Sequence, residues 1–406
     1  MSLGTAAISL AEVRSVQDGV ANDVREDGRT LLQRRPVHIT VRTSPSSPAA
    51  AAAGDAQESY NGSYVEVNAS GTVVLAAATP SVVDGCATAG PNSSAGTEHE
   101  RASDTGKGKL HITIDAVPHV LDAYASAVGG RNVSRYRRDY LAFLASTMRQ
   151  VFGAAQVEVQ EQQGVAEAEV VQEEADEGTG RAFTASSSSS PSAGAAWEAP
   201  VAGSSGDHML NGFPAADLYV GEGFGFMIHV DVHVLQSSGG NLFTAIAYAV
   251  HAVLRSLRLP AVTLHKAPGD GAGVSVEVDR SKPYRKAVSW AQMPLLCVLL
   301  VSPTGHCVVD PTLREEWAMP QQVHVAAGAN GQVMYFRYQQ LPSRRGNAYQ
   351  LQTAEPSSAT DGCASYVAPP SALSVTDCWS ILCDAVHICQ AMLHDCEEAL
   401  IHGENA

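Results

Sequence analysis

The segment from Ile228 to Pro260 constrains the fold of this chain more than any other part of the sequence. Its first half alternates apolar and polar residues, with isoleucine or valine at 228, 230, 232 and 234, which is the period of a strand with one buried face. Gly239 and Gly240 interrupt the pattern, and Asn241 is a residue type that favours a helix N-cap. Apolar residues then recur at helical spacing from Leu242 onward. The segment predicts a strand, a glycine turn and an amphipathic helix, which is how many phosphate sites are built.

The charge of the chain is concentrated in one segment. Its 406 residues, 45% of them hydrophobic, can form the cores of two or three domains. The net charge of −16 argues against a protein whose whole surface binds nucleic acid. Residues 154–217, however, contain eleven acidic side chains and a single basic one, Arg181, so the rest of the chain is only mildly acidic. A local nucleic-acid contact is therefore compatible with the composition.

Cysteine spacing and hydropathy indicate an intracellular protein. The eight cysteines lie at irregular intervals without a CxxC pair, which is typical of free thiols in a reducing compartment and predicts no zinc site. No run approaches the roughly 18 apolar residues of a membrane span. The first residues also lack the basic and apolar regions of a signal peptide. We expect a soluble nuclear or cytoplasmic protein with no membrane partner.

Three low-complexity segments interrupt the ordered-looking blocks, at 44–62, 84–108 and 154–217. The blocks between them are too short to be separate domains, so we expect insertions into the loops of one fold. Such insertions cost little stability, because loop-closure entropy rises slowly with loop length. The third is predicted to be a long disordered insertion or an acidic segment that binds a partner.

The remaining pattern predicts an α+β fold with mixed sheets and packed helices. A helix is expected at 139–152, two hairpins at 295–309 and 323–338, and a terminal helix from Ser374 to about Ile401 with Ser374 and Asp377 as a capping box. Further strands are expected at 37–41, 64–78 and 110–117.

Three segments, in this order and at compatible spacing, resemble the RNase PH family. Residues 24–36 read VREDGRTLLQRRP and match the opening signature of that family at Arg25, Asp27, Gly28, Arg29 and Arg35. Residues 230–254 read VDVHVLQSSGGNLFTAIAYAVHAVL, and residues 308–319 read VVDPTLREEWAM. The likeness covers roughly residues 20–340 outside the insertions. Within the family it is greatest to the non-catalytic ring subunits of the eukaryotic RNA exosome core.

The resemblance implies an RNase PH-like fold, built of β-α units like domain 2 of ribosomal protein S5, in a ring of six subunits through which RNA is threaded. On this chain it implies an N-terminal extension at 1–24, a first unit at 25–257 containing the insertions, and a second unit at 258–402 ending in the C-terminal helix. The implied partners are other RNase PH-like ring subunits, S1/KH cap subunits, RNA and an associated exoribonuclease. The implied role is support of 3′-to-5′ RNA processing and decay, including rRNA maturation, in the nucleus, nucleolus and cytoplasm.

The departures from the family pattern imply that this subunit is not an enzyme. Phosphorolytic members carry Gly-Thr-Arg in the glycine turn, whereas this chain has Gly240, Asn241 and Leu242, and leucine cannot donate to an anion. Those members also place paired aspartates after the following core strand to bind a metal. Here the local carboxylates are Asp310, Glu315 and Glu316. We therefore expect a degenerate phosphate turn at 239–242, with no catalytic residue, metal or cofactor. The alternatives are a phosphorolytic 3′-to-5′ exoribonuclease active in a heterodimer, and an unrelated enzyme or binding module.

RNA contact is the function left for the basic residues. It needs cations that can follow a phosphate backbone. The same residues could instead form an interface with a neighbouring ring subunit or a solvated surface. The candidates are Arg131, Arg135, Arg137 and Arg138, in a stretch that also contains tyrosines, together with Arg149.

Two other groups of polar residues are expected to be structural. The signature arginines at 25, 29 and 35 are predicted to pair with local carbonyls and carboxylates, and Asp310 to be a turn residue before Pro311. His229 and His233, on one face of the central strand, are expected to be satisfied core or interface histidines.

Overall fold

The computed structural model describes residues 8–43, 62–84, 108–125, 133–153, 215–340 and 375–404, apart from gaps at 222, 267–273, 280–281, 283, 288–292 and 320. The insertions predicted at 44–62, 84–108 and 154–217 lie almost entirely outside these residues. So does Ser374 of the predicted terminal capping box.

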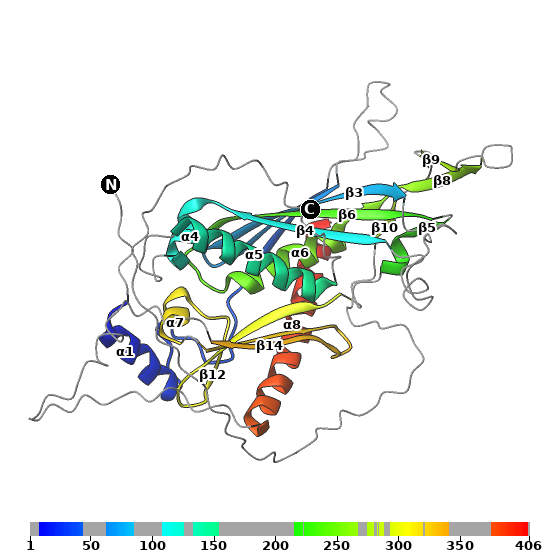
Figure 1. Ribbon diagram of the computed structural model, residues 1–406. Helices are drawn as coiled ribbons and strands as arrows, with labels where there is room; N and C mark the ends of the chain where they lie inside the picture. The colour runs from blue at the N-terminus through cyan, green and yellow to red at the C-terminus, as the bar shows by residue number, and fades with distance from the viewer. Residues whose placement is uncertain are drawn as a thin grey trace, which may run out of the picture. The chain divides into compact units, whose positions relative to one another are not determined.

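A six-stranded mixed sheet contains the central strand of the predicted strand-turn-helix unit (Figure 1). The strand order is β1-β2-β3-β6-β4, and β5 also pairs with β6. Strand β6 is antiparallel to β3 and parallel to β4. The strands are β1 (His38–Thr43), β2 (Ser63–Ala69), β3 (Thr72–Asp84), β4 (Lys109–Ala116), β5 (Tyr219–Gly221) and β6 (Phe224–Ser237).

Period-two alternation gives this sheet one buried face. The valines at 230, 232 and 234 of β6 are buried, whereas His229, Asp231 and His233 lie on the opposite face and are partly or fully exposed. Helix α6 (Leu242–Ser256) packs against β2 and β3, and α5 (Val133–Phe152) packs against β4. Helix α4 (Pro118–Ala125) contacts α5.

The second sheet is antiparallel, with the order β12-β11-β13-β14. Its strands are β11 (Leu295–Val301), β12 (Cys307–Val309), β13 (Gln321–Ala327) and β14 (Val333–Gln340). Every residue of β11 and β13 is buried. Helix α6 contacts β11, and α8 (Val375–Glu404) contacts both β11 and β13. Because α6 touches both sheets, it links the two halves of the core (Figure 1).

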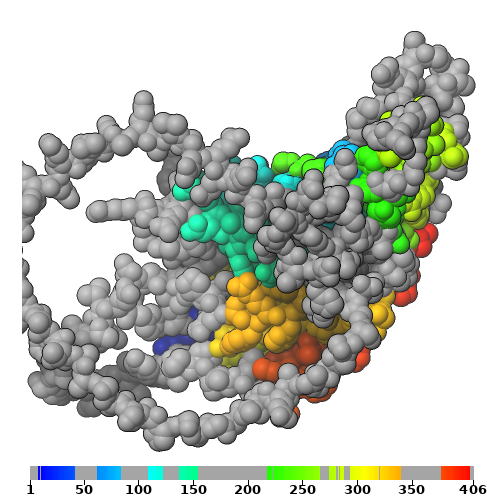
Figure 2. Space-filling model, turned by 45° about the vertical axis from the view of Figure 1, so that its right-hand side comes forward, coloured from blue at the N-terminus to red at the C-terminus, as the bar shows by residue number. Residues whose placement is uncertain are grey.

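The edge strand β14 also meets α5, the helix that carries Arg135, Arg137, Arg138 and Arg149 of the predicted RNA-binding arginines. The guanidinium of Arg337 on β14 lies 4.7 Å from the ring centre of Phe143 on α5, a cation–π distance. Figure 2 shows the two elements side by side on one face.

The smaller elements lie around this frame. Helix α7 (Leu313–Ala318) follows β12, and the 3-10 turn η2 (Ala215–Leu218) precedes β5. Two short antiparallel pairs complete the described strands: β7 (Arg258–Leu259) with β10 (Arg285–Lys286), and β8 (Ala261–Lys266) with β9 (Val274–Asp279).

The predicted α+β class with mixed sheets and packed helices is confirmed, and so are both hairpins. The prediction of a single strand at 64–78 is wrong. It is a hairpin of β2 and β3, because Ser70 and Gly71 take positive φ angles of 47° and 99° and reverse the chain. The helix expected at 139–152 begins earlier, at Val133.

Helix α1 (Leu10–Ala21) lies in the region expected to be only an N-terminal extension. It begins with a capping box of Ser9 and Glu12. Val13, Val16 and Val20 bury its apolar face in a small second core with residues of β11, β12 and α7. Among the described residues, no helix is both long and apolar enough to cross a membrane, and the six described cysteines are free thiols.

Candidate functional site

The glycine turn before α6 packs directly against the turn between β12 and α7. A Cβ atom on Gly240, whose φ is 74°, would lie 2.4 Å from the backbone nitrogen of Leu313. A Cβ on Gly239 would lie 2.5 Å from the carbonyl oxygen of Ser70. No side chain fits at such distances, so both glycines are required by contacts within the chain itself.

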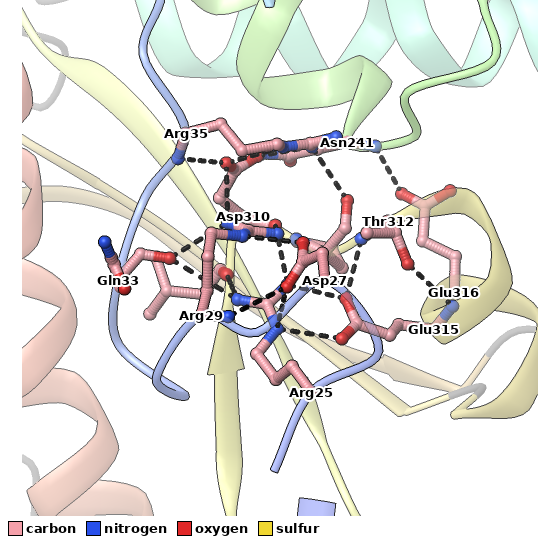
Figure 3. Close-up of polar contacts among 12 residues, drawn as sticks. Arg25, Asp27, Arg29, Gln33, Arg35, Asn241, Asp310, Thr312, Glu315 and Glu316 are labelled. Atoms are coloured by element: carbon pink, nitrogen blue, oxygen red, sulfur yellow. Dashed lines mark hydrogen bonds and ion pairs between the residues drawn. The ribbon is translucent and has the colours of Figure 1, made fainter. Parts of the chain in front are cut away.

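Asp310 is the centre of the polar network at this turn (Figure 3). Its φ of 48° confirms the prediction of a turn residue. One carboxylate oxygen accepts hydrogen bonds from the backbone N–H and the Nε of Arg35, at 2.7 and 2.9 Å, and from Arg29 at 3.1 Å. The other accepts from Arg35 at 2.7 Å and from the amide of Asn241 at 2.8 Å. Two of the three signature arginines are thus held by one carboxylate.

The charge states of this network follow from its contacts. Burial by itself would raise the pKa of the Asp310 carboxyl, but the hydrogen bonds and positive charge of Arg35 outweigh burial and hold that pKa below its usual value. The same pair raises the pKa of the Arg35 guanidinium against the opposing effect of burial. Arg35 also donates to the carbonyls of Gly239 and Pro311, which ties the N-terminal segment to both turns.

Arg25 forms a second, fully buried ion pair beside Asp310. Its Nε and one terminal nitrogen bind the two carboxylate oxygens of Glu315 at 2.8 and 2.6 Å. The guanidinium also donates to the carbonyls of Val309 and Asp310. Glu315 in turn completes the capping box of α7 with Thr312. The prediction that the signature arginines pair with local carbonyls and carboxylates is confirmed for Arg29, which binds the carboxylate of Asp27 at 2.7 Å and the carbonyl of Gln33 at 2.9 Å. The arginines also bind the carboxylates of Asp310 and Glu315, which lie 275 to 290 residues away in sequence.

The N-terminus of α6 is already occupied by a carboxyl group. The backbone N–H of Asn241 donates to Glu316 at 2.9 Å. Asn241 does occupy the N-cap position, but with φ 52° and ψ 44° it is left-handed, and its side chain makes no capping hydrogen bond because the amide donates to Asp310. A carboxyl group at this end of a helix interacts favourably with the helix dipole. The protein itself therefore supplies the acceptor that a bound anion would supply.

All four residues of the predicted degenerate turn lie at this place. Gly239 and Gly240 are buried, and so are Asn241 and Leu242. Leu242 is 1% exposed and belongs to the main hydrophobic core. The turn therefore presents no side-chain cation to solvent.

The predicted RNA-binding arginines do not form one cluster in the described part of the chain. Arg149, near the end of α5, donates twice to the carbonyl of Ile112 on β4, at 3.2 and 3.1 Å. Arg138 is exposed and Arg137 half-buried near the start of the helix. At about 1.5 Å per residue, Arg138 and Arg149 are roughly 17 Å apart along the axis. Arg131 and the side chain of Arg135 lie outside the described residues.

The histidines of β6 and their neighbours form no second candidate site in the described residues. His229 stacks edge to face on His111 at 5.5 Å, and Asp231 beside it is hydrogen-bonded to Thr113. In the residues that the structure describes, no group of three or more His, Cys, Asp or Glu side chains could hold a metal ion.

The contacts of Asn241 with Asp310 and Glu316 were not foreseen from the sequence. Asn241 is 69 and 75 residues from these partners. The sequence signal that could have indicated these contacts is the group of carboxylates after β12, three within seven residues, which could bind the N-terminus of the predicted helix.

No model of a known protein family matches the chain. A search of curated proteins also found no match. Among solved structures, the chain is similar to one described as an archaeal exosome core, with 12% identity, coverage of 95% of this chain and 96% of that one, and a TM-score of 0.47. It is also similar to an Archaeoglobus fulgidus exosome with RNA bound to the active site, with 12% identity, coverage of 94% and 96%, and a TM-score of 0.49. For rice (Oryza sativa) Rrp46 the identity is 10%, the coverage 93% and 100%, and the TM-score 0.40. Because these identities and TM-scores are low, the function of this chain has to be inferred from its own residues.

Proposed function

We propose that this chain is a catalytically inactive, RNase PH-like subunit of an RNA-processing ring of the exosome type. The resemblance of its three sequence segments to that family supports the family assignment. The single observation that carries the inactive role is the hydrogen bond from the backbone N–H of Asn241 to the carboxyl group of Glu316. In a phosphorolytic member, this helix N-terminus would have to receive phosphate.

Electrostatics disfavours phosphate at this position. Asp310 is ionised and hydrogen-bonded to Asn241, and Glu316 lies at the helix N-terminus itself. Two like unit charges about 4 Å apart repel by about 4 kcal/mol at an effective dielectric constant of about 20. The nearby arginines offer little compensation, because Arg25, Arg29 and Arg35 already bind carboxylates and carbonyls of the chain. A phosphate would have to displace these contacts before it gained any of its own.

The proposed role is therefore structural. The chain would pair with other RNase PH-like subunits, carry S1/KH cap subunits and an associated exoribonuclease, and help to thread RNA in the nucleus, nucleolus and cytoplasm. Of the predicted RNA-binding arginines whose side chains are described, Arg138 on α5 is exposed and is therefore proposed to meet RNA or a neighbouring subunit.

The test has two arms. The purified chain, incubated with labelled RNA, inorganic phosphate and Mg²⁺, is expected to release no nucleoside diphosphates. Affinity purification of the native protein is expected to recover RNase PH-like subunits. Release of nucleoside diphosphates by the chain, or by a heterodimer whose partner has been inactivated, would establish a phosphorolytic enzyme instead. Recovery of the native protein without any such subunit would refute the ring assignment.

A further inference from the structure

The short antiparallel pair of β7 and β10 presents a group of basic side chains. Residues 258–286 contain six lysines and arginines and three acidic residues, in a chain whose net charge is −16. Arg258 on β7 is exposed, and so are both residues of β10, Arg285 and Lys286. Lys282, just before β10, is another exposed cation. Positive charge is therefore concentrated on one small element of an acidic protein, which is typical of a surface that binds a polyanion.

The register of the pair sets two cations directly opposite each other. Arg258 faces Lys286 across the two strands. Residues that face each other in an antiparallel pair have Cβ atoms about 5 Å apart, and like charges in such positions destabilise the pair. The two acidic side chains described in this segment have partners of their own, because Asp279 pairs with Lys282 at 3.0 Å and Glu277 with His265 at 3.1 Å. An anion bound between Arg258 and Lys286 would relieve their repulsion.

The core holds this basic pair in place. Leu257 and Leu259 are fully buried, Ala287 is 2% exposed, and the backbone N–H of Ala287 donates to the carbonyl of Leu257 at 3.1 Å. Arg285 donates to the carbonyl of Asp217 at 2.9 Å, which joins β10 to the turn before β5 (Figure 1). The backbone that carries the cations is therefore fixed before any ligand binds, which lowers the entropy cost of binding.

An exposed aromatic ring follows the same turn. Tyr219, the first residue of β5, is 38% exposed and lies two residues after Asp217. Its hydroxyl accepts a hydrogen bond of 3.3 Å from the backbone N–H of Gly223, which restrains the ring. Proteins that bind single-stranded nucleic acid without sequence preference combine cations that follow the phosphates with aromatic rings on which bases stack. Strands β5, β7 and β10 supply both groups.

We propose that Arg258, Lys286 and Tyr219 form a binding surface for single-stranded RNA, with the two cations on phosphates and the ring stacked on a base. The choice of RNA among single-stranded polyanions rests on the proposed function. The surface belongs to β5, β7 and β10 rather than to α5, so it is a contact separate from that proposed for Arg138.

The salt dependence of RNA binding tests the proposal. The purified full chain is titrated into a labelled oligouridylate at about 50 and about 200 mM salt. Arg258→Gln and Lys286→Gln should each weaken binding several-fold and reduce the slope of log affinity against log salt by about 0.7, the value for one phosphate contact on a single strand. Arg14→Gln, the matched control at an exposed arginine on α1, should change neither quantity.

The aromatic part of the surface has its own pair of variants. Tyr219→Ala should weaken binding without changing the salt slope, because stacking involves no phosphate, and Tyr219→Phe, which keeps the ring, should bind more tightly than Tyr219→Ala. Equal thermal unfolding midpoints of the variants and the wild type would show that the losses do not come from misfolding.

The results that would overturn the proposal differ from those that would refute the proposed function. A wild-type chain that does not bind the oligonucleotide, or glutamine variants with unchanged affinity and slope, would overturn the RNA surface. If these variants instead fail to recover a ring subunit in affinity purification while RNA affinity and slope stay the same, the surface contacts a protein and the proposal is wrong. Failure of the wild type to recover any RNase PH-like subunit refutes the ring assignment, whereas reduced salt slopes of the two variants would still support the RNA surface.

Discussion

Replacing Glu315 with glutamine removes the counter-charge of Arg25 while preserving the shape of the side chain. In the wild-type protein the two side chains are 0% and 2% exposed and are joined by hydrogen bonds of 2.8 and 2.6 Å. Glutamine can still accept one hydrogen bond with its remaining carbonyl oxygen. The guanidinium, however, would then be a buried cation without the carboxylate to which it is hydrogen-bonded, and the carboxylate of Asp27, 4.0 Å from its Nε, would remain as a more distant anion.

Breaking a buried ion pair by removing one partner costs roughly 3–5 kcal/mol. Arg25 retains the carbonyls of Val309 and Asp310 as acceptors, which favours the lower end of that range. We therefore expect Glu315→Gln to destabilise the protein by about 3 kcal/mol, or roughly 150-fold in the unfolding equilibrium. Such a loss leaves a typical domain folded at room temperature.

The matched control is Glu26→Gln. Glu26 pairs with Arg314 at 3.0 Å, but these side chains are 39% and 50% exposed, so water screens the charges and we expect no measurable change. Urea titrations of the wild type and both variants would measure the difference in free energy of unfolding. If the two variants lose equal stability, the argument that burial makes the Arg25–Glu315 pair structural is wrong.

Three further results are expected. Gly240→Ala should lower the free energy of unfolding by at least about 2 kcal/mol, because its Cβ would lie 2.4 Å from a backbone nitrogen. Gly305→Ala, also at positive φ but in open space, should lower it by less. Equal losses would show that backbone strain alone, and not the close contact, sets the cost. The pKa of Asp310 is lower in the folded protein than its value of about 3.9 in the unfolded chain, so this carboxylate adds stability above that value, and the stability is lost as pH falls through the folded pKa. The free energy of unfolding should therefore fall between about pH 5 and pH 3. A free energy of unfolding that stays constant over this range would contradict the network. Arg138→Glu should weaken RNA binding by the assembled ring without affecting assembly. Arg14→Glu, at an exposed arginine on α1, should leave RNA binding unchanged. Equal RNA affinity of the two variants would show that Arg138 does not contact RNA.

The elements that the sequence predicts well are those whose signals are local. Strand β6 and helix α6 follow from apolar residues at periods of two and 3.6, and the β13–β14 hairpin follows from Asn330 and Gly331 at its turn. The β2–β3 hairpin was missed because the apolar alternation continues almost unbroken through Ser70 and Gly71. Helix α1 was missed although Ser9 and Glu12 already had capping-box spacing.

The polar network could be predicted only in part. The signature arginines and Asp310 were predicted to be structural, whereas Glu315 and Glu316 were recognised only as part of the motif at 308–319, without a predicted partner. Their exact pairing was not predictable, since it depends on a contact between segments some 280 residues apart. The positive φ of Asp310 and Asn241 was equally hidden, because tertiary hydrogen bonds hold both residues in a conformation that few side chains adopt.

The position of β6 in the first sheet has a consequence for synthesis on the ribosome. This strand lies between β3 and β4, yet it follows them by more than one hundred residues in the chain. Until Phe224–Ser237 has left the ribosome, β3 and β4 have no common neighbour, and the apolar residues that will face α6 remain uncovered. Early strands with unpaired edges are prone to association with other chains. Folding of this half should therefore be a late event in translation, and chaperone contacts should concentrate on chains stalled before residue 237.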